Sequence, residues 1–233
     1  MNGKIAVSMM CADIAKTVET ITIFEENDID FLHIDVMDGC FVPNLQLGVD
    51  YIMQLRNLSK IPLDIHLMIT EPEKKLEWFD IKEGEMVSVH YESTENLNQA
   101  LTFIKQKGAV PVLALNPATS IDVIKEHVSN VGVILLMTVN PGHAGQKMVP
   151  QMFEKIKQLR KYLDSAGYDN VKIEVDGNVS FENAKLMHDA GADIFVAGSS
   201  SVFHKDMTLI EAIAKLKNSI SESKITHRER NDH

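Results

Sequence analysis

The sequence predicts an α/β protein that folds as a single (β/α)8 TIM barrel, and three observations support this fold class. The chain has 233 residues, a length that suits one barrel domain. Short apolar or β-branched segments recur along it at roughly the spacing of a βα unit. Residues typical of helix starts and helix ends lie between those segments. About eight such units can be counted, which is the number that closes a barrel.

The predicted strands are the apolar segments themselves, which begin near Lys4, Phe31, Ile61, Met86, Ala109, Val131, Val171 and Asp193. The predicted helices are recognised by residues that favour the first turn of a helix. Such starts occur at Pro72, Thr94, Thr119 with Ser120, Pro150, and Ser180. Gly108, Gly167 and Gly191 each follow a helical pattern and precede a strand, as expected of a left-handed residue after the last turn.

An open, doubly wound sheet is the alternative fold, because it also alternates strands with helices. Its signature is a glycine-rich nucleotide-binding loop after the first strand. In this chain the first strand is followed by Ser8-Met9-Met10-Cys11 instead, so the barrel is preferred. In a barrel the active site lies at the carboxyl ends of the strands, which is where functional residues are expected.

The composition excludes several classes of function. With 45% hydrophobic and 24% charged residues, the chain has the make-up of an ordinary soluble domain with a sizeable core. A net charge of -10 and a pI near 5.3 argue against binding to nucleic acid, which needs clustered Lys and Arg. No apolar stretch approaches the roughly 20 residues of a membrane span. We therefore expect neither nucleic acid nor a membrane as a partner.

A cytoplasmic location is expected from the cysteines and the N-terminus. Cys11 and Cys40 do not form a close pair, and the N-terminus lacks a basic stretch followed by an apolar run. The barrel domain is expected to span residues 1–223. Residues 224–233 are charged and have no hydrophobic period, so a disordered tail is predicted there.

Two histidines and two aspartates carry the strongest functional signal. His33 and Asp35 lie two apart in an apolar strand, so their side chains point to the same face. His66 lies near the end of the third predicted strand, and Asp176 ends the seventh. Four such groups at strand ends suggest a metal site rather than core histidines with satisfied hydrogen bonds. Mixed nitrogen and oxygen ligands favour zinc, iron, manganese or cobalt over magnesium or calcium.

Five motifs resemble the ribulose-phosphate 3-epimerase family, in the same order and over a region from about Ile5 to Phe203. They are His33 to Asn44, His66 to Met68, Met137 to Gly142, Glu174 to Gly177, and Val196 to Ser199. Five motifs in order make the resemblance specific. Similar motifs occur in enzymes that epimerise allulose 6-phosphate, so the carbon number of the substrate stays open.

The resemblance implies a metal-dependent isomerase that interconverts D-ribulose 5-phosphate and D-xylulose 5-phosphate through a cis-enediolate. It implies a metal ion held by His33, Asp35, His66 and Asp176, with the two aspartates also acting as acid and base on opposite faces of the substrate. Two such groups are needed because a single base would return the proton to the face it left. The metal would stabilise the enediolate as a Lewis acid, and no organic cofactor is required.

Further substrate contacts are implied by the same resemblance. Ser8 matches a substrate-contacting serine after the first strand, and His66 is expected to contact substrate as well as metal. Met37, Met68 and Met137 match methionines that cover the intermediate in the family, although a methionine on a strand is by itself usually core filler.

Three glycine-bearing turns follow the last three predicted strands, where barrel loops commonly bind phosphate through backbone amides. They contain Gly142, His143, Ala144 and Gly145, then Gly177 and Asn178, and finally Gly198 and Ser199. The chain departs from the family pattern here. His143 replaces an aromatic residue, Asn178 stands where glycine is frequent, and Ser200 stands where alanine is common. His143 either folds over the substrate or stays exposed.

Several rival functions share this barrel. The main alternative is a D-allulose-6-phosphate 3-epimerase, which would form fructose 6-phosphate. Phosphosugar decarboxylases typically use an Asp-x-Lys-x-x-Asp array, and the segment from Asp35 to Asp38 has no such lysine. A non-catalytic sugar-phosphate sensor would normally have lost Asp35 or Asp176. A homo-oligomer is expected because such assemblies are common among these barrels.

Overall fold

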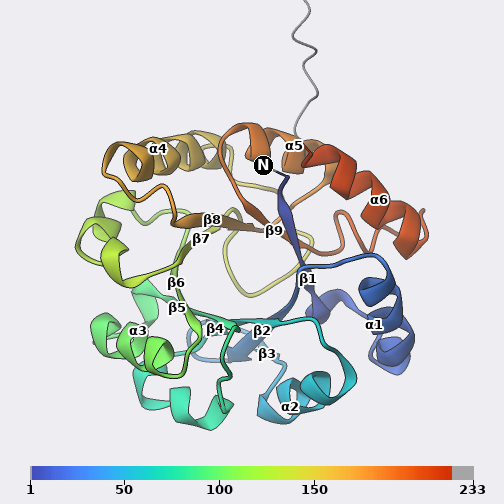
Figure 1. The fold of residues 1–233 in the computed structure, drawn as a ribbon, viewed down its shortest axis with the longest axis horizontal. Coiled ribbons are helices and arrows are strands. Elements are labelled where there is room, and N and C mark those ends of the chain that lie inside the picture. Colours follow the sequence, from blue (N-terminus) through green and yellow to red (C-terminus); the bar gives the residue numbers. More distant parts are fainter. Residues whose placement is uncertain (1, 222–233) are drawn as a thin grey trace, which may run out of the picture.

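The computed structural model describes residues 2–221, which form a closed barrel of parallel strands ringed by helices (Figure 1). The barrel strands are β1 (Lys4–Ser8), β2 (Phe31–Asp38), β4 (Leu63–Met68), β5 (Met86–His90), β6 (Val110–Leu115), β7 (Val133–Met137), β8 (Lys172–Asp176) and β9 (Ile194–Ala197). Each begins within two residues of a predicted start. The predicted tail at 224–233 lies outside the described residues, and the domain bounds 1–223 stay a prediction.

The ring of strands closes because β1 pairs with both β9 and β2. Val7 lies opposite Ala197 on one side, and Ser8 lies opposite His33 on the other. All pairings within the barrel are parallel, as expected when a helical crossover joins successive strands. The pairing of β1 with β2 excludes the open, doubly wound sheet. The predicted (β/α)8 barrel is therefore confirmed.

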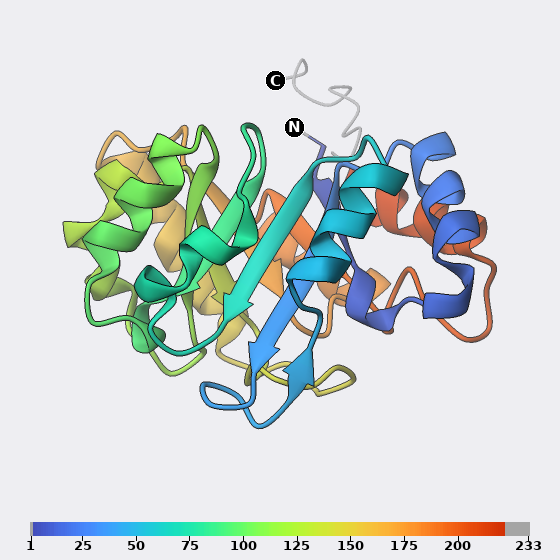
Figure 2. The same cartoon turned by 90° about the horizontal axis from the view of Figure 1, so that it is seen from below.

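The α-helices of the described chain pack around the outside of the barrel (Figures 1 and 2). They are α1 (Thr17–Glu26), α2 (Val49–Leu58), α3 (Leu97–Gln106), α4 (Met152–Ser165), α5 (Phe181–Asp189) and α6 (Leu209–Ser219). The predicted helix-ending glycines have left-handed backbones, with φ of 77° at Gly108, 79° at Gly167 and 108° at Gly191. Within residues 2–221, no helix combines the length and the apolar character needed to cross a membrane.

Two of the predicted helical segments form short 3-10 helices instead of α-helices. The start at Pro72 leads to Pro72–Lys74 and Leu76–Phe79, and the start at Ser120 leads to Ile121–Glu126 and Val128–Asn130. In the first segment, Glu71 and Asp80 flank the helices with left-handed backbones. The interval between them allows about two turns, which suits short 3-10 pieces better than a stable α-helix.

A short strand that the sequence analysis missed extends the sheet beside the barrel mouth. This strand, β3 (Leu45–Gln46), pairs antiparallel with the end of β2. Two residues are too few to produce a recognisable period in the sequence. The hairpin that joins β2 to β3 lies next to the loop that follows β7, below the barrel in Figure 2.

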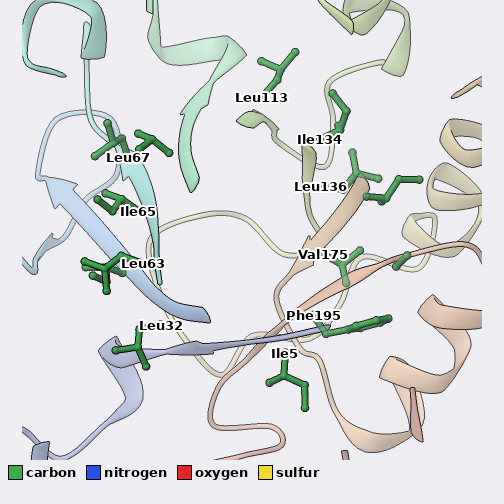
Figure 3. Close-up of a cluster of buried hydrophobic side chains, with 14 of the residues drawn as sticks. Ile5, Leu32, Leu63, Ile65, Leu67, Leu113, Ile134, Leu136, Val175 and Phe195 are labelled. Atoms are coloured by element: carbon green, nitrogen blue, oxygen red, sulfur yellow. The ribbon is translucent and has the colours of Figure 1, made fainter. Parts of the chain in front are cut away.

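Alternate residues of the strands belong to two separate apolar clusters. One set packs against the surrounding helices, and Figure 3 shows members of it, including Ile5, Leu136 and Phe195. The other set fills the inside of the barrel and comprises Ala6, Met86, Val112, Ala114, Val133, Leu135, Met137, Ile194 and Val196. This alternation turns every second strand residue toward the barrel axis, and it therefore decides which polar side chains can meet there.

The core assignment can be tested with two identical exchanges. Leu136→Ala should lower the free energy of unfolding by about 2–5 kcal/mol because removal of a fully buried side chain leaves a cavity. Leu186→Ala alters a side chain that is 51% exposed and should change the same quantity by less than about 0.5 kcal/mol. Chemical denaturation followed by circular dichroism measures both. Equal losses in the two variants would contradict the assignment of Leu136 to the core.

Candidate active site

The four predicted metal ligands meet at the carboxyl ends of their strands. His33 Nε2 lies 3.3 Å from Asp35 Oδ1 and 3.9 Å from Asp176 Oδ2. His66 Nδ1 lies 3.3 Å and 3.6 Å from the same two oxygens. Asp35 is opposite His66 in the register of β2 and β4, whereas β8 brings Asp176 from across the barrel. One donor atom from each residue lies within 4.8 Å of the others.

The geometry of this cluster fits a divalent metal ion. His33 Nε2 and His66 Nδ1 are fully buried and have no hydrogen-bond partner, although buried polar atoms rarely remain unpaired. Ligand atoms bonded at about 2.0–2.2 Å to a tetrahedral zinc ion lie roughly 3.3–3.6 Å apart. The separations between the histidine nitrogens and the carboxylate oxygens are close to that range. The cluster can therefore bind a metal ion.

The two aspartates differ in proton affinity. Burial and the neighbouring Asp35 carboxylate raise the pKa of Asp176 to about 7. Burial also acts to raise the pKa of Asp35, but the adjacent His33 and His66 outweigh it and hold this pKa well below its usual value. Ser8 Oγ donates a hydrogen bond of 2.8 Å to Asp35 Oδ2 and further favours its ionised form. Carboxyl groups with divergent pKa values in one site can divide the roles of acid and base.

The outer partners of the histidines were missed by the sequence analysis or left unassigned. Buried Asp64 pairs its Oδ2 with His33 Nδ1 at 2.5 Å, and buried His90 pairs its Nε2 with His66 Nε2 at 2.8 Å. Glu174 lies beside Asp64, and burial followed by this neighbour raises the Glu174 pKa well above its usual value. Asp64 and Glu174 each precede a predicted ligand by two residues. The period of a strand could therefore have located them.

All of the predicted substrate-contacting residues except His66 line one cavity at this end of the barrel. They are Ser8, Met37, Met68, Met137, Gly142, His143, Ala144, Gly145, Gly177, Asn178, Gly198 and Ser199, together with Asp35 and Asp176. His33 and His66 are fully buried and do not line it. Lining residues that were not predicted are Met10, Cys11, Val139, Asn140, Pro141, Gln146, Val179, Val196 and Ser200.

The loop after β7 is held over the mouth of the barrel (Figures 1 and 2). Asn44 Nδ2, from the β2–β3 hairpin, donates to the carbonyl oxygen of Gly142 at 2.9 Å. Gly142 has φ of 115°, and a Cβ atom added there would lie 3.1 Å from Val42 Cβ, so a larger residue would be strained. Gln146 Nε2 donates to the carbonyl oxygens of Asn140 and His143 and closes the loop on itself. The side chain of His143 is exposed at the loop tip.

Two of the departures from the family pattern meet in the glycine turns. Asn178 has a left-handed backbone with φ of 48°, and its Nδ2 lies 3.4 Å from Ser200 Oγ. Next to it, Gly177 has φ of 116°, and a Cβ atom there would lie 2.6 Å from Val139 Cγ2. A side chain at position 177 would have to displace Val139 in a left-handed backbone, so glycine is favoured there and leaves the turn backbone open to the cavity.

The fold and the site together define a TIM-barrel enzyme with a histidine and carboxylate centre at the carboxyl ends of its strands. Residues 4–203 match the sequence model of the Ribulose-phosphate 3 epimerase family, and the chain belongs to that family. It is therefore an epimerase, an enzyme of the isomerase class.

Curated relatives resemble the chain over most of its length. Ribulose-phosphate 3-epimerase of Bacillus subtilis is 38% identical over 216 residues, which cover 93% of this chain and 99% of the relative. The chloroplastic ribulose-5-phosphate-3-epimerase of Arabidopsis thaliana is 40% identical over 215 residues, which cover 91% of this chain and 75% of the relative. Ribulose-phosphate 3-epimerase of Escherichia coli K12 is 36% identical over 197 residues, which cover 84% of this chain and 87% of the relative.

Solved structures with low sequence identity share the fold. KGPDC from Streptococcus mutans superposes with a TM-score of 0.67 at 14% identity, covering 94% of this chain and 98% of the other. The 3-keto-L-gulonate-6-phosphate decarboxylase from Vibrio cholerae gives a TM-score of 0.69 at 11% identity, and the superposition covers 94% of this chain and 98% of the decarboxylase. At these identities the likeness concerns the barrel alone.

The raised pKa of Asp176 predicts a pH dependence of stability in the metal-free protein. An ordinary aspartate has a pKa of 3.8, whereas that of folded Asp176 is about 7, so the folded state binds the proton more tightly than the unfolded state. The stabilisation is present below about pH 4 and is lost as the pH rises toward about 7.

The measurement is the free energy of unfolding of the chelator-treated wild type relative to Asp176→Asn, which cannot titrate at this position. This difference should fall between about pH 4 and pH 7 and level off above that interval. Parallel pH profiles for the two proteins would contradict the raised pKa.

Proposed function

We propose that this enzyme interconverts D-ribulose 5-phosphate and D-xylulose 5-phosphate by metal-dependent, two-base proton transfer through a cis-enediolate. The observation that carries the proposal is the presence of Asp35 and Asp176 in one site with different proton affinities. The names of the curated relatives support the substrate.

The positions of the two aspartates suit inversion at a carbon atom. Asp35 is on β2 and Asp176 is on β8, and two other strands separate β2 from β8 around the ring. The carboxyl groups therefore approach the cavity from different sides. One group can take a proton from one face of the substrate while the other returns a proton to the opposite face. The Ser8 hydroxyl, which bonds Asp35 Oδ2, orients Asp35 for this role.

His33, Asp35, His66 and Asp176 would hold a divalent ion of zinc, iron, manganese or cobalt, and the proposal requires no organic cofactor. When bound, such an ion supplies Lewis-acid stabilisation of negative charge that develops beside the substrate carbonyl. The burial of the two imidazoles keeps bulk water away from the ligand atoms and so strengthens their interactions.

The remaining lining residues would bind and orient the ketose phosphate. Met37 and Met68 pack together with Val42, and with Met137 they offer a polarizable apolar surface above the reacting carbons. Ser8 would contact the substrate beside them, whereas His66, which is buried and does not line the cavity, would reach the substrate only through the metal ion. The phosphate would lie against the backbone of the three glycine turns. The turn residues that line the cavity are Gly142, His143, Ala144, Gly145, Gly177, Asn178, Gly198 and Ser199.

D-allulose 6-phosphate is the alternative substrate, and the same residues would act on its carbon 3. Decarboxylation is disfavoured because no lysine is among the described residues that line the cavity, so no ammonium group is placed to protonate a carbanion. A non-catalytic sensor is disfavoured by the retention of both aspartates. We also propose that the enzyme is cytoplasmic and forms a homo-oligomer.

Metal removal and replacement will test the proposed reaction. Treatment with a chelator should abolish epimerisation, and one of Zn²⁺, Fe²⁺, Mn²⁺ or Co²⁺ should restore it. The assay follows D-ribulose 5-phosphate and D-allulose 6-phosphate in parallel, so the preferred sugar decides between the two substrates. Asp35→Asn and Asp176→Asn should each lower kcat by roughly 10²–10⁴-fold because each removes a proton carrier. A metal-loaded, folded protein that turns over neither sugar would refute the proposal.

The phosphate-binding role of the glycine turns can be tested at Gly177. Gly177→Ala places a methyl group against Val139 in a left-handed backbone, at a cost of about 1–3 kcal/mol. If the turn binds phosphate, KM for the sugar phosphate should rise by roughly 5- to 100-fold. Gly48→Ala, with nothing within 4 Å of the added Cβ, is the matched control and should leave KM unchanged. An unchanged KM in a folded Gly177→Ala variant would place the phosphate elsewhere.

A further inference from the structure

His66 meets the candidate metal site through one ring nitrogen and a second histidine through the other. Its Nδ1 is the unpartnered atom that faces Asp35 and Asp176. Its Nε2 lies 2.8 Å from His90 Nε2, and the two rings meet edge to edge, with their centroids 5.0 Å apart and an angle of 21° between their planes. One of the two facing nitrogens must donate the hydrogen and the other must accept it.

The next contact in the chain decides the direction of that hydrogen bond. His90 Nδ1 lies 3.3 Å from Glu92 Oε2, and an ionised carboxylate can only accept. His90 therefore carries its hydrogen on Nδ1, which leaves its Nε2 as an acceptor. It follows that the hydrogen of His66 is on Nε2. Its Nδ1 then turns a lone pair, rather than a hydrogen, toward Asp35 Oδ1 at 3.3 Å, and this lone pair can bind a metal.

Glu92 is itself held in place by the neighbouring βα unit. Its Oε1 accepts from the backbone N–H of Asn116 at 2.9 Å and from the Thr119 hydroxyl. The same loop is clamped by Lys155 on α4, whose ammonium group donates to the carbonyl oxygens of Asn116, Pro117 and Thr119. The orientation of the carboxylate is thus set by contacts outside the metal site.

The two histidines present different nitrogens to the metal site. His33 faces it with Nε2 and directs Nδ1 to Asp64, whereas His66 faces it with Nδ1 and directs Nε2 to His90. A neutral imidazole in water can carry its hydrogen on either nitrogen. Each ligand therefore needs its own outer partner to hold the tautomer that can bind metal.

We propose that His90 and Glu92 are positioning residues that hold His66 in the Nε2–H tautomer and so direct its Nδ1 lone pair to the metal. This inference rests on the metal site of the proposed function. It assigns a role to two buried or half-buried titratable side chains that the proton transfer does not use.

The tautomers can be measured directly in the wild-type protein without metal. Two-bond ¹H–¹⁵N spectra of histidine-labelled, chelator-treated protein should show the hydrogen of His66 on Nε2 and that of His90 on Nδ1. His66 with its hydrogen on Nδ1, or a mixture of both forms, would overturn the proposal.

Two exchanges at His90 separate hydrogen bonding from packing. His90→Phe keeps an aromatic ring against Phe41 but removes the acceptor, whereas the Gln oxygen in His90→Gln can take the place of Nε2. A chelator competition assay should show zinc binding weakened about 10- to 100-fold in His90→Phe, as is typical of losing an outer partner of a metal ligand. Binding in His90→Gln should remain close to that of the wild type.

The control is His127→Phe, the same exchange at a histidine that bonds Asn98 outside the site. It should leave zinc affinity unchanged. Glu92→Gln retains one oxygen but cannot accept from all three partners of Glu92. It should therefore weaken zinc binding, but less than His90→Phe does. This variant carries the test if His90→Phe does not fold, as judged by circular dichroism. If folded His90→Phe or folded Glu92→Gln bound zinc as tightly as the wild type, the proposal would be overturned.

The two proposals can fail separately. If the wild type binds no divalent ion, the proposed metal-dependent reaction is wrong, and the tautomer spectra still decide whether His90 positions His66. If the wild type binds zinc and turns over substrate but the tautomers of His66 are mixed, the positioning role is wrong and the proposed reaction stands.

Discussion

The pairing of β1 with β2 is the constraint on which the rest of the structure depends, because it closes the sheet into a ring. In an open sheet, β8 would lie far from β4 and their side chains could not meet. Closure places Asp176 opposite His66 and turns the alternation of each strand into an inside and an outside. The strand side chains on the outside of the barrel pack under the helices. Those on the inside include the polar groups at the carboxyl ends of the strands. The helices, the cavity and the loop over the mouth all follow from that closure.

Closure also concentrates charge inside the barrel. Asp35 and Asp176 form one buried group with His33 and His66, and Asp64 and Glu174 form a second group around the same His33. Burial and the neighbouring carboxyl groups raise the pKa values of Glu174 and Asp176, whereas His33 and His66 hold the pKa of Asp35 below its usual value. The same repulsion that raises the pKa of Asp176 makes the site receptive to a cation. The chemical asymmetry between Asp35 and Asp176 is therefore a consequence of the fold.

Much of the fold was predictable, because a buried parallel strand is a contiguous apolar segment with recognisable ends. The strand starts and the helix-ending glycines were placed correctly for that reason. The segments after Pro72 and Ser120 were predicted as helices without their 3-10 character, since helix type depends on the space left by the surrounding loops. Asp64 and Glu174 were overlooked although they share the inward face with His66 and Asp176. The period of their strands places both on that face, and the sequence analysis used this period only for His33 and Asp35.

The sequence by itself determined the strand order along the chain, the inward alternation, and the set of four candidate ligands, because each depends on short-range spacing. Only the tertiary structure decided which nitrogen of each histidine faces the site, which aspartate keeps a proton near neutral pH, and that Asn178 meets Ser200. These properties depend on distances between strands and loops that are remote in the sequence. Such distances are set by closure and packing, to which no local pattern is sensitive.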